Sequence, residues 1–162
     1  MNARKSSAAA VQNRTTVERK SAREVVVTRM IDAPARLVFE AWSKPELFKR
    51  WWVPRSMGMT LRSCEMDVRT DGRYHLNFGD GMHFFGRYIE VTPPARIVWT
   101  NEEGGENGSL TTVTFEDQGG RTLLVMTDLY PSKEALDAAG TGAADVMHET
   151  LAQLEELLAT LA

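Results

Sequence analysis

Short segments that alternate apolar and polar residues make up most of the chain, which is the pattern of half-buried β-strands. Asp71-Gly72, Asp80-Gly81 and Gly119-Gly120 separate some of these segments and are typical of tight hairpin turns. The pattern predicts seven strands, near residues 24–31, 59–70, 73–79, 82–91, 96–101, 109–116 and 121–130. Strands joined by such short turns form an antiparallel sheet.

The first strand pattern ends at Asp32-Ala-Pro and becomes helical. Asp32 can cap a helix, and Pro34 suits a first helical turn. Apolar residues then recur at helical spacing, at Leu37, Val38, Ala41 and Trp42. Pro45 opens a second short helix. Its apolar face contains Leu47, Phe48, Trp51 and Trp52.

The C-terminal segment predicts a longer helix, from about residue 143 to residue 161. Its apolar residues step by three or four and form one continuous stripe. They are Met147, Leu151, Leu154, Leu158 and Leu161.

The composition fits one compact domain. The chain has 162 residues, 43% of them hydrophobic, and we expect a single domain over residues 24–162. Residues 1–23 hold six basic residues against one acidic residue and almost no large apolar side chain, so we expect a disordered basic tail. An organelle transit peptide or a nucleic-acid-binding arm are the alternatives for this tail. The net charge of −3 makes the remainder acidic, which argues against a nucleic-acid partner.

Cysteine content and hydropathy favour the cytoplasm. Cys64 is the only cysteine, so an internal disulfide is impossible. The chain has no apolar run near the ~20 residues of a membrane span, and no hydrophobic core of a secretory signal.

The hairpin turns also predict which side chains share a face of the sheet. If Asp80-Gly81 is a two-residue turn, Phe78 lies opposite His83, Leu76 opposite Phe85, and Tyr74 opposite Arg87. Across Gly119-Gly120 the same alternation pairs Phe115 with Leu124 and Val113 with Met126. The apolar members of these pairs then form one wall. We expect a ligand-binding cavity bordered by Trp51, Trp52, Met66, Tyr74, Leu76, His83, Phe85, Arg87, Met126, Asp128 and Met147.

Charged groups on an apolar wall need partners or a ligand. Arg87 and Asp128 are therefore the candidates to orient a ligand, with His83 and Tyr74 as secondary candidates. The structural alternative is that Arg87 and Asp128 pair with each other or with neighbours. Cys64 is expected to be an inert core thiol.

Metal, cofactor and nucleophile chemistry finds no motif in the sequence. The predicted register directs His75 and His83 to opposite faces, and His148 lies far away on the last helix. No cysteine pair, His-x-x-x-His helix motif, Gly-x-Ser-x-Gly elbow or phosphate-binding glycine loop is present. We therefore assign no catalytic residue, metal or cofactor.

Four segments in this order and spacing, residues 25–42, 64–74, 86–100 and 115–122, resemble the SRPBCC (START-like, helix-grip) superfamily. Within it the chain is most similar to the group named for the C-terminal domain of the activator of the heat-shock-protein-90 ATPase. The resemblance implies an α+β helix-grip fold, in which a curved antiparallel sheet of six or seven strands grips the C-terminal helix. That group generally has Gly-Trp near the start of this helix, where this chain has Val146-Met147.

The resemblance leaves three functions open, because the superfamily shares a cavity and not one chemistry. The favoured function is binding of a small hydrophobic or amphipathic molecule between the sheet and the last helix, by a monomer or homodimer. One alternative is a polyketide cyclase- or aromatase-like enzyme that uses an acid or base such as Asp128 or His83. The other is a chaperone-activator-like interaction domain.

Overall fold

The computed structural model describes residues 15–103 and 108–161. Eight strands form one antiparallel sheet, in the order β1-β2-β8-β7-β6-β5-β4-β3. The strands are β1 (Thr16–Arg19), β2 (Glu24–Ile31), β3 (Ser63–Met66), β4 (Arg73–Gly79), β5 (Met82–Thr92), β6 (Arg96–Thr100), β7 (Leu110–Asp117) and β8 (Thr122–Leu129). The helices are α2 (Ala35–Ser43), α3 (Pro45–Phe48), the 3₁₀ turn η1 (Arg55–Met57), α4 (Lys133–Ala139), α5 (Gly142–Asp145) and α6 (Met147–Leu161).

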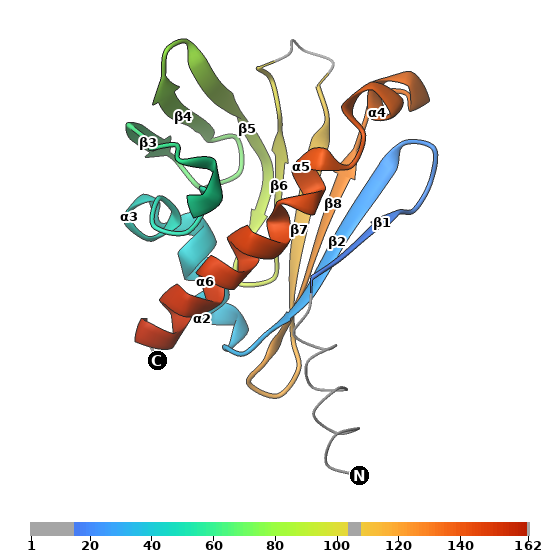
Figure 1. Cartoon of the computed structure of the whole chain (residues 1–162). Coiled ribbons are helices and arrows are strands. Elements are labelled where there is room, and N and C mark those ends of the chain that lie inside the picture. Colours follow the sequence, from blue (N-terminus) through green and yellow to red (C-terminus); the bar gives the residue numbers. More distant parts are fainter. Residues whose placement is uncertain (1–14, 104–107, 162) are drawn as a thin grey trace.

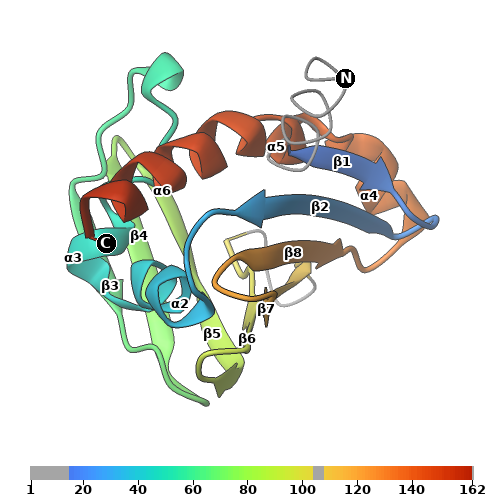
Figure 2. The ribbon, with the colours of Figure 1, turned by 90° about the horizontal axis from the view of Figure 1, so that it is seen from below.

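The sheet is curved, and α6 crosses its concave face (Figure 1). Seen from below, α2 lies in the same concavity, between α6 and the strands (Figure 2). The apolar stripe of α6 faces inward, where Met147, Leu151, Leu154 and Leu158 are buried, whereas its last predicted member, Leu161, is exposed at the end of the helix. This arrangement confirms the predicted helix-grip fold. The sheet has one strand more than expected, because β1 adds an edge strand.

Strand β1 corrects the expectation of a disordered tail over residues 1–23. Residues 16–19 pair with β2 in register, from Thr16 opposite Thr28 to Arg19 opposite Val25, and Val17 packs against the core. Composition understated the order of this segment, because an edge strand gains its stability from the backbone of its neighbour and needs few apolar side chains. Residues 1–14 of the expected tail lie outside the described residues.

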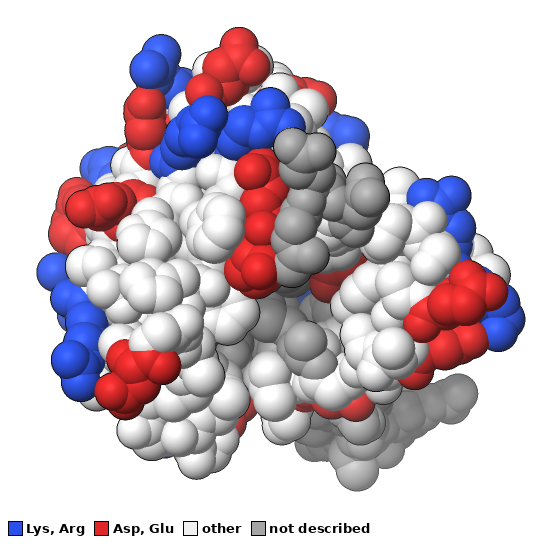
Figure 3. Space-filling view, turned by 90° about the horizontal axis from the view of Figure 1, so that it is seen from above, with Lys and Arg blue, Asp and Glu red and all other residues white. Residues whose placement is uncertain are grey.

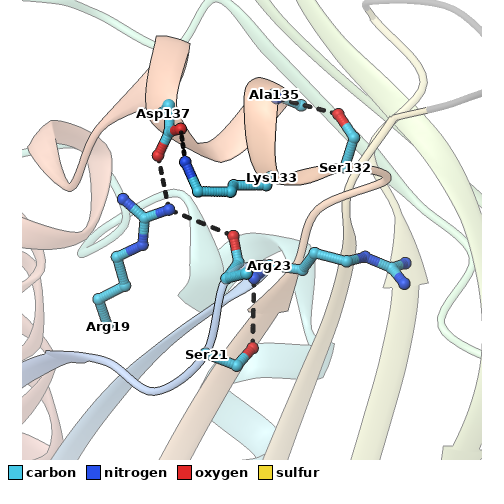
Figure 4. A network of polar contacts seen from close by, with 8 residues as sticks. Arg19, Ser21, Arg23, Ser132, Lys133, Ala135 and Asp137 are labelled. Carbon is cyan, nitrogen blue, oxygen red and sulfur yellow. Dashed lines mark hydrogen bonds and ion pairs between the residues drawn. The ribbon is translucent and has the colours of Figure 1, made fainter.

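The turn after β1 is also fastened to the far end of the chain (Figure 4). The guanidinium of Arg19 contacts the Asp137 carboxylate of α4 at 2.6 Å and donates to the carbonyl of Ala22 at 3.2 Å. Lys133 binds the second oxygen of Asp137, also at 2.6 Å. The Ser132 hydroxyl caps α4 by accepting from the Ala135 amide at 3.0 Å. Helix α4 therefore holds this end of the sheet edge.

Two helix boundaries differ from the prediction. Helix α2 begins after Pro34, whose carbonyl accepts from the amides of Leu37 and Val38. Asp32 is therefore not the cap, and its carboxylate accepts from Arg121 at 2.7 Å. The closing helix, expected as one run from residue 143, is divided into α5 and α6 at Val146.

The β3–β4 connection is longer than the predicted two-residue turn at Asp71-Gly72. Strand β3 ends at Met66 and β4 begins at Arg73. Within this connection the Asp67 amide donates to the Arg73 carbonyl. The Thr70 hydroxyl accepts from the Val91 amide of β5. The expected strand over residues 59–70 is therefore only four residues long.

The β4–β5 hairpin contains the feature that most changes the predicted site. Asp80-Gly81 forms the predicted two-residue turn, with Gly79 opposite Met82. A β-bulge between Asn77 and Gly79 then shifts the pairing by one residue, so Leu76 lies opposite Phe84. Because side chains alternate along a strand, a shift of one residue exchanges the two faces of β5. The predicted register across Gly119-Gly120 is confirmed, with Phe115 opposite Leu124 and Val113 opposite Met126.

Aromatic rings cluster in the core around Trp42. The ring of Trp42 packs edge to face against Trp51 at 4.8 Å and Trp52 at 5.7 Å, and lies 5.9 Å from both Trp99 and Phe115. Its indole Nε1 is buried and has no hydrogen-bond partner among the described residues. The neighbouring aromatic rings surround this indole. No helix within residues 15–103 and 108–161 is long and apolar enough to cross a membrane.

Gly86 is predicted to be essential for the close approach of β5 and β6. A Cβ atom at this position would lie 2.0 Å from the Thr100 carbonyl oxygen. We expect Gly86→Ala to lower the free energy of unfolding by about 1–3 kcal/mol, because backbone must move to admit the methyl group. Urea denaturation followed by circular dichroism measures this change.

Gly142→Ala is the matched control, because a Cβ atom at Gly142 meets nothing within 4 Å. It should leave stability unchanged or slightly higher. Equal stability of the two variants would contradict the close contact at Gly86.

Candidate functional site

One apolar pocket lies between the β3–β6 end of the sheet, the segment that follows α3, and the start of α6. Its volume is about 390 Å³. The sheet contributes Met66, Tyr74, Leu76, Phe78, Met82, Phe84, Tyr88, Ile97 and Trp99, and Asn101 follows directly after β6. The remaining lining residues are Trp42, Phe48, Trp52, Val53, Pro54, Met57, Met59, Val146, Met147 and Thr150.

Exposed apolar side chains form the rim of this pocket. Met57 is 52% exposed, Met82 44%, and Phe84 and Val146 37% each. Large apolar side chains exposed together around a cavity are typical of binding sites, and methionine adapts its shape to different contacts. From above, the surface of the molecule is hollowed, with uncharged atoms around the hollow and acidic side chains beside it (Figure 3).

A short strap, residues 53–57, covers one side of the pocket and is fastened to α6. The buried Gln153 side chain donates through Nε2 to the carbonyls of Trp51 and Val53, each at 2.9 Å, and accepts from the Arg55 amide at 2.9 Å. Glu149 accepts from the Ser56 hydroxyl at 2.5 Å and from the Ser56 amide at 3.0 Å, and these two bonds lower the pKa of Glu149. The strap therefore depends on polar side chains of α6 for its position.

One end of the pocket is polar, and we call the group Tyr74, Trp99 and Asn101 the polar end. The Tyr74 hydroxyl donates to the Thr100 carbonyl at 2.7 Å. The indole Nε1 of Trp99 donates to Asn101 Oδ1 at 3.3 Å, while Asn101 Nδ2 lies 3.1 Å from the Ser109 carbonyl. An indole N–H only donates and a carbonyl only accepts, so these two neighbours fix the orientation of the Asn101 amide.

Hydrogen bonds extend from the polar end to a shielded carboxyl group. Asn101 Nδ2 donates to the hydroxyl of the buried Thr111 at 2.9 Å, and that hydroxyl donates to Asp128 Oδ1 at 2.6 Å. Burial raises the pKa of Asp128, and the hydrogen bond from Thr111 partly opposes this shift. Asp128 is thus connected to the pocket through Thr111 and Asn101 but does not line it.

Charged residues lie beside the polar end. Glu102 accepts from the Thr100 hydroxyl at 2.5 Å and from Arg87 Nε at 3.1 Å, and these contacts lower its pKa. Burial raises the pKa of Tyr74, and the charges of Glu103 and Glu102 raise it further. The Tyr74 hydroxyl is therefore held protonated at neutral pH.

Five residues of the expected cavity line the pocket. They are Trp52, Met66, Tyr74, Leu76 and Met147. The pairing of β3 with β4 places Met66 opposite Tyr74, and the α6 stripe brings Met147 to the same space.

Three other expected residues lie inside the fold but do not line the pocket. Trp51 is completely buried in the aromatic core, where its Nε1 donates to the Ala41 carbonyl at 2.9 Å. Met126 belongs to the core between β2 and β7. Asp128 is bound by Thr111, two strands away from the pocket-lining strand β6.

The bulge moves His83, Phe85 and Arg87 to the convex face of the sheet. Phe85 is 41% exposed there, and Arg87 pairs with Glu102. Arg87 therefore does not face the pocket, which corrects its expected role in orienting a ligand. Of the structural alternative, pairing of Arg87 with Asp128 is wrong, whereas pairing with neighbours is confirmed, because Arg87 binds Glu102 and Asp128 binds Thr111. The residues that face the pocket from β5 are Met82, Phe84 and Tyr88.

His75 and His83 share the convex face, contrary to the predicted register. Their ring nitrogens Nε2 and Nδ1 are 2.9 Å apart and the rings are stacked. Among residues 15–103 and 108–161, no group of three or more potential ligands could hold a metal ion. Cys64 is half-buried beside Met66, and burial raises the pKa of its thiol to about 11.

The sequence contained a signal for the pocket residues that the prediction missed. Gly79 precedes the Asp80-Gly81 turn, and an isolated glycine at the end of a strand pattern often marks a bulge. Including this bulge would have placed Met82 and Phe84 in the pocket. No comparable local pattern indicates Asn101, which the prediction assigned to the end of a strand.

The fold and pocket define a class of protein, the helix-grip domains that enclose a cavity between a curved sheet and a C-terminal helix. The sequence profile of the family described as activator of Hsp90 ATPase homolog 1-like protein matches residues 32–159. The chain belongs to this family, within the SRPBCC fold group.

Solved structures support the assignment of the fold. A crystal structure of a Rhodobacter sphaeroides protein is 26% identical, with a TM-score of 0.79, over 91% of this chain and 99% of that one. A solution structure from Staphylococcus epidermidis is also 26% identical, with a TM-score of 0.68, over 91% and 95%. CalU16 of Micromonospora echinospora is 21% identical, with a TM-score of 0.62, over 89% and 83%. A comparison with curated proteins gives no match.

Gln153 provides a test of the strap. Replacing Gln153 by leucine keeps its size but leaves two carbonyls and one amide without partners. We expect the free energy of unfolding to fall by at least about 2 kcal/mol, because each unpaired buried polar group is costly. Glu156→Gln is the control on the same helix, since it removes only the exposed ion pair with Arg55. If both variants match the wild type in urea denaturation, Gln153 does not fasten the strap.

Asp128 should make a pH-dependent contribution to stability. Because its folded pKa lies above the unfolded value, the native state binds more protons between these two values, and stability falls as the pH rises through them. Asp128→Asn removes this loss, so the variant should gain on the wild type in free energy of unfolding between about pH 3 and neutrality. Parallel urea titrations over this range measure the difference. A difference independent of pH would show that Asp128 titrates normally.

Proposed function

We propose that the protein binds a small hydrophobic or amphipathic molecule in the pocket between the sheet and α6. The observation that carries the proposal is the combination of a cavity of about 390 Å³ with an almost entirely apolar lining and one polar end. Such a cavity lies within the usual size range of small-molecule sites, and a few fixed polar groups in an apolar site are typical of ligand recognition.

The apolar surface of the pocket and its rim favours the same function. An apolar cavity costs stability, because the side chains around it lose contacts that a filled core would provide. Exposed Met57, Met82 and Phe84 add apolar surface to its rim. An apolar ligand removes both kinds of surface from water and thereby stabilises the folded chain.

The enzymatic alternative has little geometric support. His83 lies on the convex face, and Thr111 and Asn101 separate Asp128 from the pocket. A general acid or base must lie within hydrogen-bonding reach of the reacting group, directly or through one water. The chaperone-activator alternative has only the family's name in its favour.

A cytoplasmic location and a monomeric or homodimeric state stay predictions.

Met147→Trp tests the pocket as a binding site. The indole would occupy part of the cavity from the start of α6, so binding of the apolar fluorophore N-phenyl-1-naphthylamine should weaken at least about tenfold. A fluorescence titration measures this affinity, and the melting temperature reports whether the fold persists.

Ala159→Trp is the control, since it adds the same side chain at an exposed position of α6. It should bind the probe as the wild type does. Absence of binding to the wild-type protein, or equal binding by both variants, would contradict the proposal.

A further inference from the structure

The hydrogen bonds of the polar end use its donors and leave its acceptors available. We infer that the ligand of this pocket carries a hydrogen-bond donor, a hydroxyl or amine group attached to an apolar body, and that this donor binds the Tyr74 oxygen. The inference rests on the proposed binding function and adds the chemical class of the ligand.

The Tyr74 hydroxyl has its proton bound within the protein. This hydroxyl has one proton, and the Thr100 carbonyl, which can only accept, takes that proton at 2.7 Å. Asn101 Oδ1 lies 3.4 Å from the same hydroxyl and is also an acceptor, so the proton cannot serve both. What Tyr74 presents to the pocket is therefore an oxygen lone pair.

The N–H donors of Asn101 and Trp99 are also bound within the protein. The amide Nδ2 of Asn101 is surrounded by the Ser109 carbonyl, the Ser109 hydroxyl and the Thr111 hydroxyl, at 2.9 to 3.1 Å. The indole proton of Trp99 is directed to Asn101 Oδ1. Both residues line the pocket, and their donors are bound within the protein.

Thr111 and Asp128, which do not line the pocket, fix the orientation of the Asn101 amide. Thr111 donates its only proton to Asp128, so its oxygen accepts from Asn101 and the amide cannot reverse. Reversal would also place the amide nitrogen against the Trp99 indole N–H. The orientation of the polar end is thus determined by four hydrogen-bonded side chains and does not depend on a ligand.

Charge favours the same class of ligand. Glu102 and Glu103 lie close enough to raise the pKa of Tyr74. Arg87 is the partner of Glu102 and lies on the convex face. The charge of Glu102 is offset by Arg87 and Arg73, so Glu103, whose effect on Tyr74 is the larger, is the carboxylate that disfavours an anionic head group beside this acceptor surface.

Three naphthalene derivatives of similar shape test the inference by isothermal titration calorimetry with the full chain at neutral pH. 2-Naphthol offers a donor, 2-methoxynaphthalene offers only an acceptor, and 2-naphthoate is an anion. We expect 2-naphthol to bind about three- to tenfold more tightly than 2-methoxynaphthalene, as one additional hydrogen bond provides, although the methyl ether is the more apolar molecule. 2-Naphthoate should bind most weakly.

Tyr74→Phe should reduce the preference for 2-naphthol to near unity and leave 2-methoxynaphthalene affinity unchanged. Tyr130→Phe is the control, because it removes the same hydroxyl group from a tyrosine that does not line the pocket; it should keep the preference. Equal affinity of the wild type for the alcohol and the ether, or tighter binding of the anion, would overturn the inference without affecting the proposed function. A preference that survives in Tyr74→Phe would place the acceptor elsewhere and also overturn it. Failure of all three compounds to bind would contradict the proposed function itself.

Discussion

The register of the β4–β5 hairpin is the constraint on which the pocket depends. Side chains alternate along a strand, so the single extra residue between Asn77 and Gly79 decides which alternate side chains of β5 point to the concave face of the sheet. With the bulge, Met82 and Phe84 enter the pocket and His83 and Arg87 leave it. The same wall without the bulge would bring a histidine and an arginine into the cavity, and its chemistry would be that of a cationic site. A local backbone feature thus determines the polarity of a binding site.

The polar end depends on a second backbone constraint, the close approach of β5 to β6. The Thr100 carbonyl occupies the place where a side chain at position 86 would begin, and the Tyr74 hydroxyl binds that carbonyl. Glycine at this position therefore allows Tyr74, on the neighbouring strand, to be oriented by the backbone of β6. Because the backbone of a sheet interior is rigid, the hydroxyl proton has one direction, and the pocket wall has a fixed polarity before any ligand binds.

The sequence predicted the parts of the fold that arise from local periodicity, and failed where distant segments meet. The α6 stripe and the Gly119-Gly120 hairpin were correct in face and register, because both follow from spacing within one segment. Strand β1 was missed because its stability comes from the backbone of β2 and from Arg19 bound to Asp137, 118 residues away. In the site, Leu76 was predicted from strand alternation and Met147 from the helical spacing of the α6 stripe. The role of Asn101 was not, because its partners Thr111 and Asp128 are brought to it only by the pairing of β6, β7 and β8.

Two kinds of side chain contribute differently to ligand recognition in this pocket. Five methionines line it, and their unbranched side chains can adjust to ligands of different outline, so the apolar part discriminates weakly by shape. The polar end cannot adjust in the same way, because each donor already has a partner within the protein. This site combines an adaptable apolar wall with a fixed acceptor surface. It selects ligands by the position of their hydrogen-bond donor more than by their size, because a misplaced or absent donor leaves desolvated acceptors unpaired. The structure therefore favours a ligand class defined by one functional group on a variable apolar body.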